Sequence, residues 1–491
     1  MLNRKTKIVC SLGPASFSDE VVRDLILSGM NVARLNFSHG DHETHKKSIE
    51  RVRRISDELG KHIAVLLDTK GPEIRTGMVE GSGPQVNKDI TINKDDYVDV
   101  STDGSFTTAA NGGSPAKISI SWKEAASKLK SGHHILIADG LLDLEVLGVK
   151  DGIVNCRAKN TAAIGSKKNV NLTGVHAGLP IMSEQDKKDI AFGAEMSVDF
   201  IAASFVSFAY EITEIKEYLK NFDSTIRVIA KIENGDGVEN IREIAQVADG
   251  VMVARGDLGV QLPTEQVPLI QKQIISVCRK FGKPVITATQ MLDSMITNPR
   301  PTRAESNDVA NAIFDGTDAV MLSGETANGA YPIEAVKIMD KIARTVEQSY
   351  EFRECMEKLR HECLIDDHSP RDNLGITMAR AGVEISASVN AKVIVTSSLR
   401  GRTARFLAAF RPDQPILAVT PTERVMRVMQ LYWGVTPCHA PVAEETECMI
   451  NNSMRITLES KMAKETDKVV LVAGLPIHSE NPVNTVRVIV L

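Results

Sequence analysis

Polar side chains stand at the ends of several short apolar segments, and their types suggest metal and anion chemistry. Lys231 and Glu233 are two residues apart at the end of one segment, so on a β-strand both side chains point to the same face. Asp257 follows the next apolar segment. Two carboxylates from neighbouring strands can hold one hard divalent cation, with water and substrate oxygens completing its coordination. The lysine would then place a fixed positive charge beside the metal.

Two other interpretations of Lys231 and Glu233 remain open from the residues alone. The pair could form a structural salt bridge that fills the mouth of the fold. The lysine could also form a Schiff base with a carbonyl substrate. The side chains around the pair must therefore decide between these roles.

Basic side chains are concentrated at the same segment ends, although the whole chain carries a net charge of −5. Arginine forks match phosphate and carboxylate oxygens two at a time, so this concentration predicts a substrate rich in such oxygens. Gly256, beside Asp257, allows close approach of the backbone, whose N–H groups could bind an anion. Taken singly, an arginine is more often part of a surface ion pair. The basic residues are Arg34, Lys70, Arg75, Lys231 and Arg255.

The composition of the 491-residue chain excludes several classes of protein. With 63 acidic against 58 basic residues, it lacks the basic excess of a general nucleic-acid binder, and 4% aromatic residues are too few for a base-stacking platform. No Walker loop, dinucleotide fingerprint or nucleophile elbow occurs. The seven cysteines show no C-x-x-C spacing, and no apolar run is long enough to span a bilayer. We therefore expect a cytoplasmic protein without nucleic-acid or membrane partners.

Parallel strands are needed to bring these side chains together, and the chain alternates apolar segments with helical segments. Continuous apolar strands between helices are typical of parallel sheets buried on both faces. Eight such units predict an α/β fold with a closed (β/α)8 TIM barrel, and an open doubly wound sheet is the alternative. The predicted strands are residues 7–11, 31–36, 64–68, 199–205, 227–233, 250–255, 284–289 and 318–323. The predicted helices include residues 18–27, 42–59, 183–195, 207–220, 266–281 and 302–314.

Two regions depart from this alternation. Short strand-like pieces and turn clusters after residue 71 predict an inserted small β-barrel domain, which could act as a lid over the carboxyl ends of the barrel strands. Beyond about residue 345 a second alternation predicts a C-terminal open-sheet α/β domain. The predicted domains are the barrel (1–70 and 166–344), the lid (71–165) and the C-terminal domain (345–491).

Six motifs, in their order along the chain, resemble those of the pyruvate kinase family. The resemblance spans essentially the whole chain, including the interrupted barrel and the C-terminal domain. A chance match to all six motifs in this order is not credible. The motifs are RLNFSHG at 34–40, DTKGPEIRTG at 68–77, KIEN at 231–234, MVARGDLG at 252–259, ATQMLDSM at 288–295 and MLSGETA at 321–327.

The resemblance implies a glycolytic phosphotransferase that moves the phosphoryl group of phosphoenolpyruvate to ADP, giving pyruvate and ATP. The lysine of KIEN would stabilise the phosphoryl group in transfer, Arg34 would bind its oxygens, and Thr289 would serve the protonation of the enolate. The implied catalytic residues are Lys231, Arg34 and Thr289; the implied substrate contacts are Gly256, Asp257, Thr289, Lys231 and Ser204; and the implied ligands of Mg²⁺ (or Mn²⁺) are Glu233 and Asp257.

The resemblance also implies a K⁺ site and a nucleotide side. Glu73 resembles the residue of the K⁺-dependent members, where independent members have lysine. The β domain would close over the site and exclude water. The implied K⁺ ligands are Asn36, Ser38, Asp68 and the carbonyl of Thr69, and the implied nucleotide contacts are Arg75, His39, Asn36 and Lys168.

Members of this family carry allosteric control in the C-terminal domain, and the resemblance further implies a homotetramer. A strand-to-helix junction rich in hydroxyl groups could bind the phosphate of an effector, with an ordinary helix cap as the alternative. The chain departs from the compact effector loop of the family by inserting Leu399 and Arg400, so the effector stays open between fructose bisphosphate, another sugar phosphate, AMP and none. The implied effector residues are Thr396, Ser397, Ser398, Arg402 and Thr403.

Two rival functions belong to other classes. A metal-assisted aldolase of the phosphoenolpyruvate/pyruvate barrel type would use Glu233 and Asp257 to hold an enolate, but it would not explain the lid or the C-terminal domain. A metabolite-sensing barrel without activity would be expected to have lost part of the constellation, whereas every matched catalytic position is intact. Pyruvate formation from phosphoenolpyruvate and ADP separates the three functions.

Overall fold

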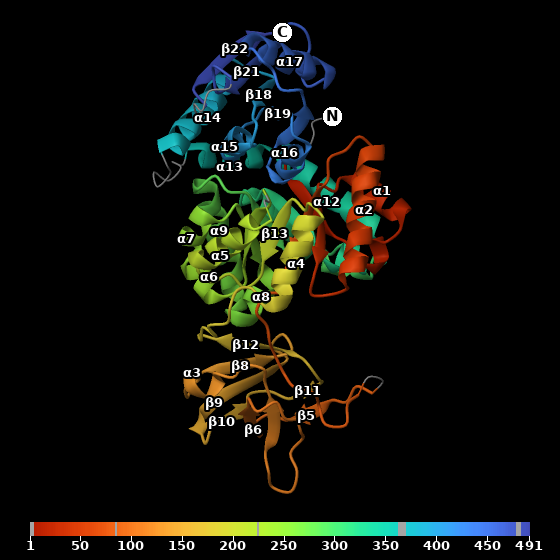
Figure 1. Cartoon of the computed structure of the whole chain (residues 1–491), viewed down its shortest axis with the longest axis vertical. Coiled ribbons are helices and arrows are strands. Elements are labelled where there is room, and N and C mark those ends of the chain that lie inside the picture. Colours follow the sequence, from red (N-terminus) through yellow and green to blue (C-terminus); the bar gives the residue numbers. More distant parts are fainter. Residues whose placement is uncertain (1–3, 84–85, 223–224, 362–369, 478–482) are drawn as a thin grey trace.

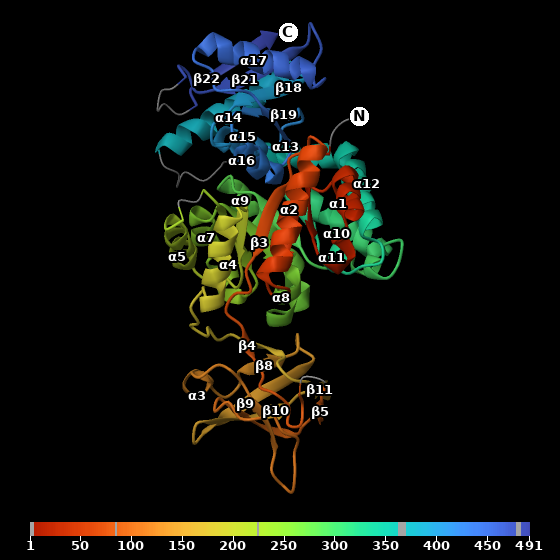
Figure 2. The same cartoon turned by 45° about the vertical axis from the view of Figure 1, so that its right-hand side comes forward.

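The computed structural model describes residues 4–83, 86–222, 225–361, 370–477 and 483–491 of the chain. Its three parts are stacked along one axis, with the inserted β domain at one end, the barrel in the middle and the C-terminal domain at the other end (Figure 1). A view turned by 45° shows the same stacking (Figure 2). Along the described ranges, no helix is both long enough and apolar enough to cross a membrane.

Eight parallel strands form a closed barrel in the order β1-β17-β16-β15-β14-β13-β3-β2, so the predicted TIM barrel is confirmed and the open sheet is wrong. The predicted apolar segments supply all eight strands because these strands are buried on both faces. The strands are β1 (Lys7–Ser11), β2 (Val32–Asn36), β3 (Ala64–Asp68), β13 (Phe200–Ala203), β14 (Arg227–Ile232), β15 (Gly250–Ala254), β16 (Val285–Ala288) and β17 (Ala319–Leu322).

Helices cover the outside of the barrel, and their apolar faces pack against the strands. Ser18, Ser183 and Thr302 each accept a backbone N–H of the following first turn, which fixes where three of the helices begin. The covering helices are α1 (Asp19–Ser28), α2 (His42–Glu58), α4 (Glu184–Glu195), α5 (Ala209–Lys220), α7 (Ile241–Val247), α9 (Val267–Lys280), α10 (Arg303–Phe314) and α12 (Pro332–Gln348). Short helices follow three strands and are α6 (Gly235–Glu239), α8 (Arg255–Gln261) and α11 (Gly324–Ala327).

The barrel interior is a packed core rather than a pore. Alternate side chains of the strands, among them Phe200, Met252 and Met321, fill it and are buried. Side chains that can meet a substrate must therefore come from the strand ends and the loops that follow them.

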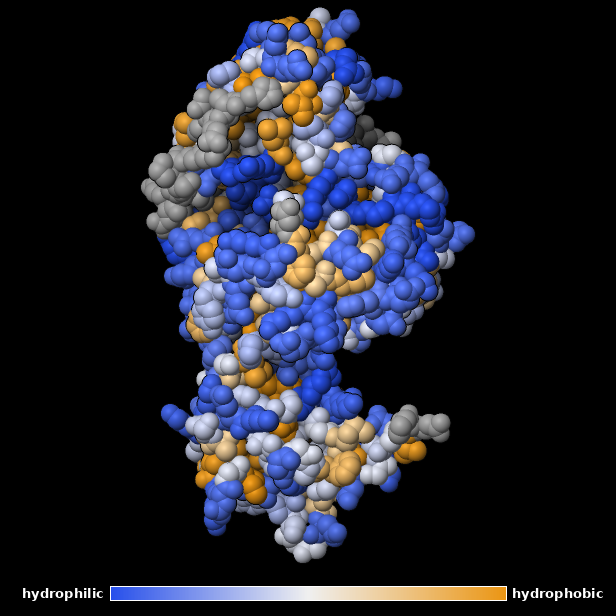
Figure 3. All heavy atoms as spheres, viewed as in Figure 1, coloured by the Kyte–Doolittle hydropathy of each residue, from blue (hydrophilic) through white to orange (hydrophobic). Residues whose placement is uncertain are grey.

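The inserted β domain is confirmed. Seven of its strands form one sheet in the order β4-β12-β8-β9-β10-β6-β7, and β5 pairs with β11. Gly77 N donates to Ser119 O at 2.7 Å and Ser121 N donates to Arg75 O at 2.9 Å, so the two edges of the sheet meet and the sheet curls into a small barrel. A narrow waist joins this domain to the larger barrel (Figure 3). Its elements are β4 (Ile74–Arg75), β5 (Ile90–Ile92), β6 (Tyr97–Ser101), β7 (Ala116–Ser119), α3 (Ala125–Lys128), β8 (His134–Ile137), β9 (Leu142–Lys150), β10 (Ile153–Ala158), β11 (Ala162–Ile164) and β12 (Asn169–Thr173).

Two residues that the sequence marks as domain boundaries lie inside or beside structural units. Strand β12 comes after residue 165 and pairs with β8 and β4, so the sheet of the β domain continues past that residue. Residue 345 lies inside α12, and α13 (Tyr350–His361) packs Phe352 and Met356 into the core of the large barrel.

The predicted open sheet of the C-terminal domain is confirmed, with five strands in the order β20-β19-β18-β21-β22 and helices on both faces. This domain contacts the amino-terminal ends of the barrel strands, where Lys7 Nζ donates to Val435 O at 2.7 Å. The carboxyl ends of the strands therefore face the β domain. The elements are α14 (Pro370–Ser388), β18 (Val393–Ser397), α15 (Arg402–Ala409), β19 (Ile416–Thr420), α16 (Glu423–Val428), β20 (Val435–His439), α17 (Thr446–Glu459), β21 (Lys468–Ala473) and β22 (Thr485–Val490).

Candidate active site beneath the β domain

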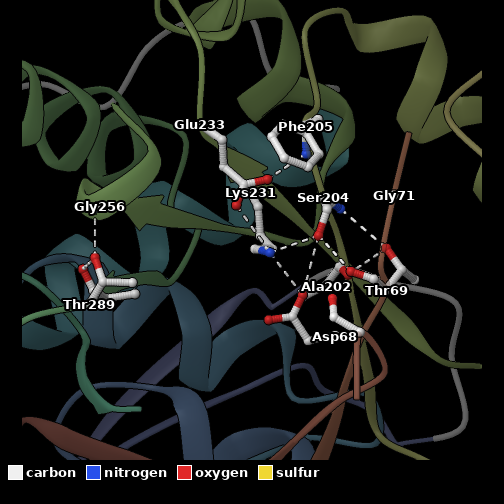
Figure 4. A network of polar contacts seen from close by, with 12 residues as sticks. Asp68, Thr69, Gly71, Ala202, Ser204, Phe205, Lys231, Glu233, Gly256 and Thr289 are labelled. Atoms are coloured by element: carbon white, nitrogen blue, oxygen red, sulfur yellow. Dashed lines mark hydrogen bonds and ion pairs between the residues drawn. The ribbon is translucent and has the colours of Figure 1, made fainter. Parts of the chain in front are cut away.

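Lys231 lies at the centre of a polar network at the carboxyl ends of β3, β13 and β14 (Figure 4). Its Nζ is 2.9 Å from Asp68 Oδ1 and 3.1 Å from Glu233 Oε1, and it donates to Ser204 Oγ at 2.7 Å. Because residues i and i+2 of a strand share a face, the end of β14 presents Lys231 and Glu233 together. The salt bridge considered as an alternative role is thus present, but as one contact of a larger network.

Arg34 joins this network from β2. Its Nη2 is 2.6 Å from Asp68 Oδ2, and its Nε donates to the same oxygen at 2.7 Å. Burial by itself raises the pKa of Asp68, but attraction to Lys231 and Arg34 prevails and holds that pKa below its usual value. Burial alone would lower the pKa of Lys231, yet Asp68 and Glu233 raise it above its usual value. Lys231 therefore stays positively charged at neutral pH.

Glu233 and Asp257 are interacting carboxyl groups from neighbouring units of the barrel. Phe205 N donates to Glu233 Oε2 at 2.6 Å. Burial raises the pKa of Glu233 above its usual value, and repulsion from Asp257 contributes to the rise. Burial also raises the pKa of Asp257.

A divalent cation between these two carboxylates would remove their mutual repulsion, so the pair fits the Mg²⁺ or Mn²⁺ site that the resemblance implies. Glu233 and Asp257 would hold the ion through oxygen atoms, the donors that such cations prefer. Among the residues whose placement is described, no three His, Cys, Asp or Glu side chains form a cluster suited to a metal. Water and substrate oxygens would have to complete the coordination.

Thr289 and Gly256 meet on the other side of the barrel mouth (Figure 4). Gly256 N donates to Thr289 Oγ1 at 2.8 Å, and the Thr289 hydroxyl donates to Ala288 O at 2.7 Å. Thr289 and Gln290 have φ angles of 69° and 53°, a left-handed backbone that is uncommon for residues with a Cβ atom. The turn after β16 is thus held in an unusual shape beside the network.

The residues implied for K⁺ lie on two paired strands and the turns after them. Asn36 of β2 is the register partner of Asp68 on β3. Asn36 Oδ1 accepts the backbone N–H of Ser38 at 3.1 Å, and Thr69 O accepts the hydroxyl of Ser204 at 2.7 Å. The set offers only oxygen donors, which suits a hard cation. Asp68 and the Ser204 hydroxyl also connect this set to the Lys231 network.

The residues implied for the nucleotide fall into two groups. Asn36 and His39 lie at the end of β2, whereas Arg75 and Lys168 lie at the root of the β domain. Arg75 donates from Nε to Glu73 Oε2 at 2.7 Å and from Nη1 to the carbonyl of Lys167 at 2.9 Å. Over the described ranges, no hydrogen bond or ion pair joins the two groups.

Arg255 does not contribute to a cationic mouth as the sequence suggests. Its Nε donates to Ala288 O at 3.2 Å and its Nη2 donates to Thr289 O at 2.7 Å. Its Nη1 lies 2.6 Å from Asp308 Oδ1. Arg255 is the first residue of α8, and its guanidinium contacts the end of β16 together with α9 and α10.

A cavity of about 380 Å³ adjoins the network, between the barrel and the segment that returns from the β domain. Asp257 and Phe205 belong to its barrel wall, and His176 belongs to the returning segment. His176 Nδ1 lies 3.3 Å from Asp236 Oδ2, and this contact links the returning segment to α6. The sequence does not predict a role for His176 or Asp236, because neither residue lies at the end of a predicted strand or in one of the six motifs.

The residues implied for an effector lie where β18 passes into α15. Ser397, Ser398, Arg402 and Thr403 line a second cavity, of about 410 Å³. Arg402 Nη1 is 3.2 Å from Asp372 Oδ1. Other parts of the wall are apolar and come from residues such as Leu399, Pro421, Val442 and Ile477. Thr396 is buried, and its Oγ1 has no hydrogen-bond partner within the described part of the chain.

Comparisons with known proteins agree with one another. A family model described as the pyruvate kinase barrel domain matches residues 3–336, and one described as the pyruvate kinase alpha/beta domain matches residues 377–489. A pyruvate kinase of Geobacillus stearothermophilus is 45% identical over 495 residues, which cover 100% of this chain and 81% of that protein. A pyruvate kinase of Staphylococcus aureus is 43% identical over 489 residues, which cover 99% of this chain and 80% of that protein. The crystal structure of a pyruvate kinase from Cryptosporidium parvum has a TM-score of 0.90 and 38% identity, and the match covers 99% of this chain and 96% of that one.

Proposed function

The chain belongs to the pyruvate kinase family, and from this premise we propose that it transfers the phosphoryl group of phosphoenolpyruvate to ADP. The bond between phosphorus and the enol oxygen breaks, a new bond forms to a terminal oxygen of ADP, and the enolate gains a proton to become pyruvate. The single observation that carries the proposal is Asp68, a buried carboxylate that binds both Lys231 and Arg34 beside the pair Glu233 and Asp257. Phosphoryl transfer depends mainly on positioning and on stabilising charge, which this arrangement can supply.

Lys231 and Arg34 act on the phosphoryl group. Asp68 holds both side chains in place before the substrate binds, so little reorganisation is needed when negative charge moves during transfer. The ammonium of Lys231 stabilises the charge on the phosphoryl group, and the guanidinium of Arg34 binds its oxygens in pairs.

Glu233 and Asp257 hold the divalent cation. When bound, Mg²⁺ or Mn²⁺ supplies positive charge between these carboxylates and the oxygens of the substrate. The backbone around Gly256 and Asp257 binds the carboxylate of phosphoenolpyruvate, and Ser204 lines the same site. The Thr289 hydroxyl, held between Gly256 N and Ala288 O, lies on the side where the enolate receives its proton.

A monovalent cation and the nucleotide complete the site. K⁺ binds to the oxygen atoms of Asn36, Ser38, Asp68 and Thr69, and ADP lies toward Arg75, His39, Asn36 and Lys168. The β domain closes over the bound substrates and keeps out water, which would otherwise accept the phosphoryl group. The curled sheet and its narrow connection to the barrel support this role.

The proposal extends to the organisation of the protein. A phosphorylated effector binds at Thr396, Ser397, Ser398, Arg402 and Thr403. The cavity beside the junction of β18 and α15, which the last four of these residues line, supports this assignment. The division into barrel, lid and C-terminal regulatory domain, the homotetramer and the cytoplasmic location belong to the same proposal and rest on the family resemblance.

A coupled assay of pyruvate formation tests the proposal. The purified chain is supplied with phosphoenolpyruvate and ADP, and Mg²⁺ and K⁺ are omitted in turn. We expect turnover with both cations and a large loss when either is absent. No turnover with both cations present contradicts the proposal, and a carbon–carbon bond formed with an added aldehyde would instead indicate an aldolase.

A further inference from the structure

We propose that Arg255 is a positioning residue that holds Thr289 in place, and that it does not contact the substrate. The inference deepens the proposed function and rests on it, because it takes the Thr289 hydroxyl as part of the site. It also reverses the role that the sequence suggests for Arg255 as one of the cations of the mouth.

The guanidinium of Arg255 binds two consecutive carbonyl groups of one turn. Its Nε donates to Ala288 O at 3.2 Å, and its Nη2 donates to Thr289 O at 2.7 Å. A planar fork with fixed donor directions can hold two neighbouring acceptors at once, which a lysine cannot do. The turn after β16 is therefore fixed on both sides of the Thr289 peptide.

The backbone next to Arg255 holds the same residue by its side chain. Gly256 N donates to Thr289 Oγ1 at 2.8 Å. The Arg255 side chain thus holds the carbonyl of Thr289, and the backbone N–H of Gly256 holds its hydroxyl. The orientation of that hydroxyl is set from α8.

The turn needs such support because of its backbone conformation. Thr289 and Gln290 have φ angles of 69° and 53°, and consecutive left-handed residues with Cβ atoms persist only when their surroundings hold them there. Since Thr is β-branched, this conformation is especially unfavourable for Thr289. Without the fork, the turn would relax to a conformation in which the hydroxyl points elsewhere.

Two outer helices of the barrel, α9 and α10, also hold the Arg255 side chain. Its Nη1 lies 2.6 Å from Asp308 Oδ1 of α10 and donates to Gln271 Oε1 of α9 at 3.4 Å. Only 11% of the side chain is exposed. Every nitrogen of the guanidinium has a protein partner, so the group is committed to the scaffold and has no donor directed to a substrate phosphate.

Kinetics of Arg255→Met test the inference, because this substitution keeps the apolar stem and removes the fork. We expect kcat to fall by about 10²-fold, as for a displacement of a reacting group by about 1 Å, with KM for phosphoenolpyruvate and ADP within about 3-fold. Arg455→Met, on the exposed face of α17, is the matched control and should leave both parameters unchanged. A rise of KM for phosphoenolpyruvate with unchanged kcat would indicate a direct substrate contact and overturn the inference.

A double-mutant cycle with Thr289→Val shows whether Arg255 acts through the threonine. We expect Arg255→Met to lower kcat by less than about 3-fold once the Thr289 hydroxyl is absent, because residues that act as a unit are not additive. Loss of kcat equal to the product of the two single losses overturns the inference. The exchange of the methyl hydrogens of pyruvate with D₂O, followed by NMR, should slow in Arg255→Met as much as turnover does.

A conservative variant covers the case in which Arg255→Met does not fold. The single ammonium of Arg255→Lys can reach one of the two carbonyl groups, so we expect an intermediate loss, about 10-fold, and the same non-additivity with Thr289→Val. Equal kcat in Arg255→Lys and the wild type would overturn the inference. A failure of the proposed function can be told apart from a failure of this inference, because the wild type would then form no pyruvate. In that case a crystal structure of Arg255→Met tests the positioning role, and a left-handed Thr289 in that structure would overturn it.

Discussion

Asp68 and Lys231 form an ion pair of 2.9 Å although their strands are not neighbours in the barrel. Strand β13 lies between β3 and β14, and Ser204, just beyond its end, accepts the third contact of Lys231 at 2.7 Å. The ion pair therefore joins three consecutive strands across the mouth. A substitution at any of these three residues is expected to disturb the other two.

Replacing the central lysine tests the electrostatic role of the network. We expect Lys231→Met to lower kcat by about 10³-fold, because it removes a preorganised charge from the transferring group. Its effect on Mn²⁺ affinity, measured by titration, should stay within a few-fold, since Glu233 and Asp257 remain. Lys220→Met, an exposed lysine paired with Glu217, is the control. A loss of kcat below tenfold shows that the role of Lys231 is wrong.

A substitution at Gly71 tests how closely the segment between β3 and β4 packs on the Lys231 network. Its φ is +72°, and a Cβ at this position would lie 2.7 Å from the Cβ of Ser204. We expect Gly71→Ala to lower the free energy of unfolding by about 1–3 kcal/mol and to reduce kcat, because the added methyl group displaces Ser204, whose hydroxyl accepts a hydrogen bond from Lys231. The control is Gly60→Ala, where φ is +59° and no atom lies within 4 Å of the added Cβ. An equal kcat in the two variants contradicts the packing argument.

Glu73 tests the proposed dependence on K⁺. This carboxylate accepts Arg75 Nε at 2.7 Å and lies 3.4 Å from Lys70 Nζ. We expect Glu73→Lys to bring the ratio of activity with K⁺ to activity without K⁺ closer to one, because the new ammonium supplies positive charge near the site. Glu73→Gln, which removes the negative charge and adds no positive charge, should keep most of the dependence. An unchanged ratio in Glu73→Lys speaks against the assignment.

The lowered pKa of Lys7 predicts how the free energy of unfolding depends on pH. Burial, with repulsion from Arg4, lowers the pKa of Lys7 from 10.5 to about 7 at the contact with Val435 O. Between these two values the unfolded chain binds more protons than the folded chain, so this group makes the free energy of unfolding increase as pH rises. We expect the melting temperature of the wild type to rise relative to that of Lys7→Met between pH 7 and pH 9. If the melting temperatures of both proteins changed with pH in parallel, folding would not lower the pKa of Lys7, which would contradict this prediction.

The apolar segments predict the barrel closely because parallel strands are buried on both faces. Strands β1 and β3 coincide with the predicted residues 7–11 and 64–68. Strand β12 lies beyond residue 165, the predicted end of the β domain, although Val170 and Leu172 alternate with polar residues as in a half-buried strand. Strand β4 has only two residues, which are too few to show a period.

The chemistry of the site could be predicted from the sequence only in part. Lys231 and Glu233 share a face because they are two residues apart on one strand, and this needs no tertiary structure. The contact of Lys231 with Asp68 depends on the order of the strands in the closed barrel. The direction of Arg255 depends on the start of α8, and the contact of His176 with Asp236 depends on the path of the returning segment.

Phosphorus NMR of the reaction tests the central claim most directly, because it follows the phosphoryl group itself. Phosphoenolpyruvate and ADP are incubated with the chain, Mg²⁺ and K⁺, and the signals of all phosphorus species are recorded over time. We predict that each phosphoenolpyruvate lost appears as one γ-phosphate of ATP, with no release of inorganic phosphate, and that Lys231→Met slows this conversion by about 10³-fold. Unchanged phosphoenolpyruvate, or its conversion to inorganic phosphate instead of ATP, would contradict the account.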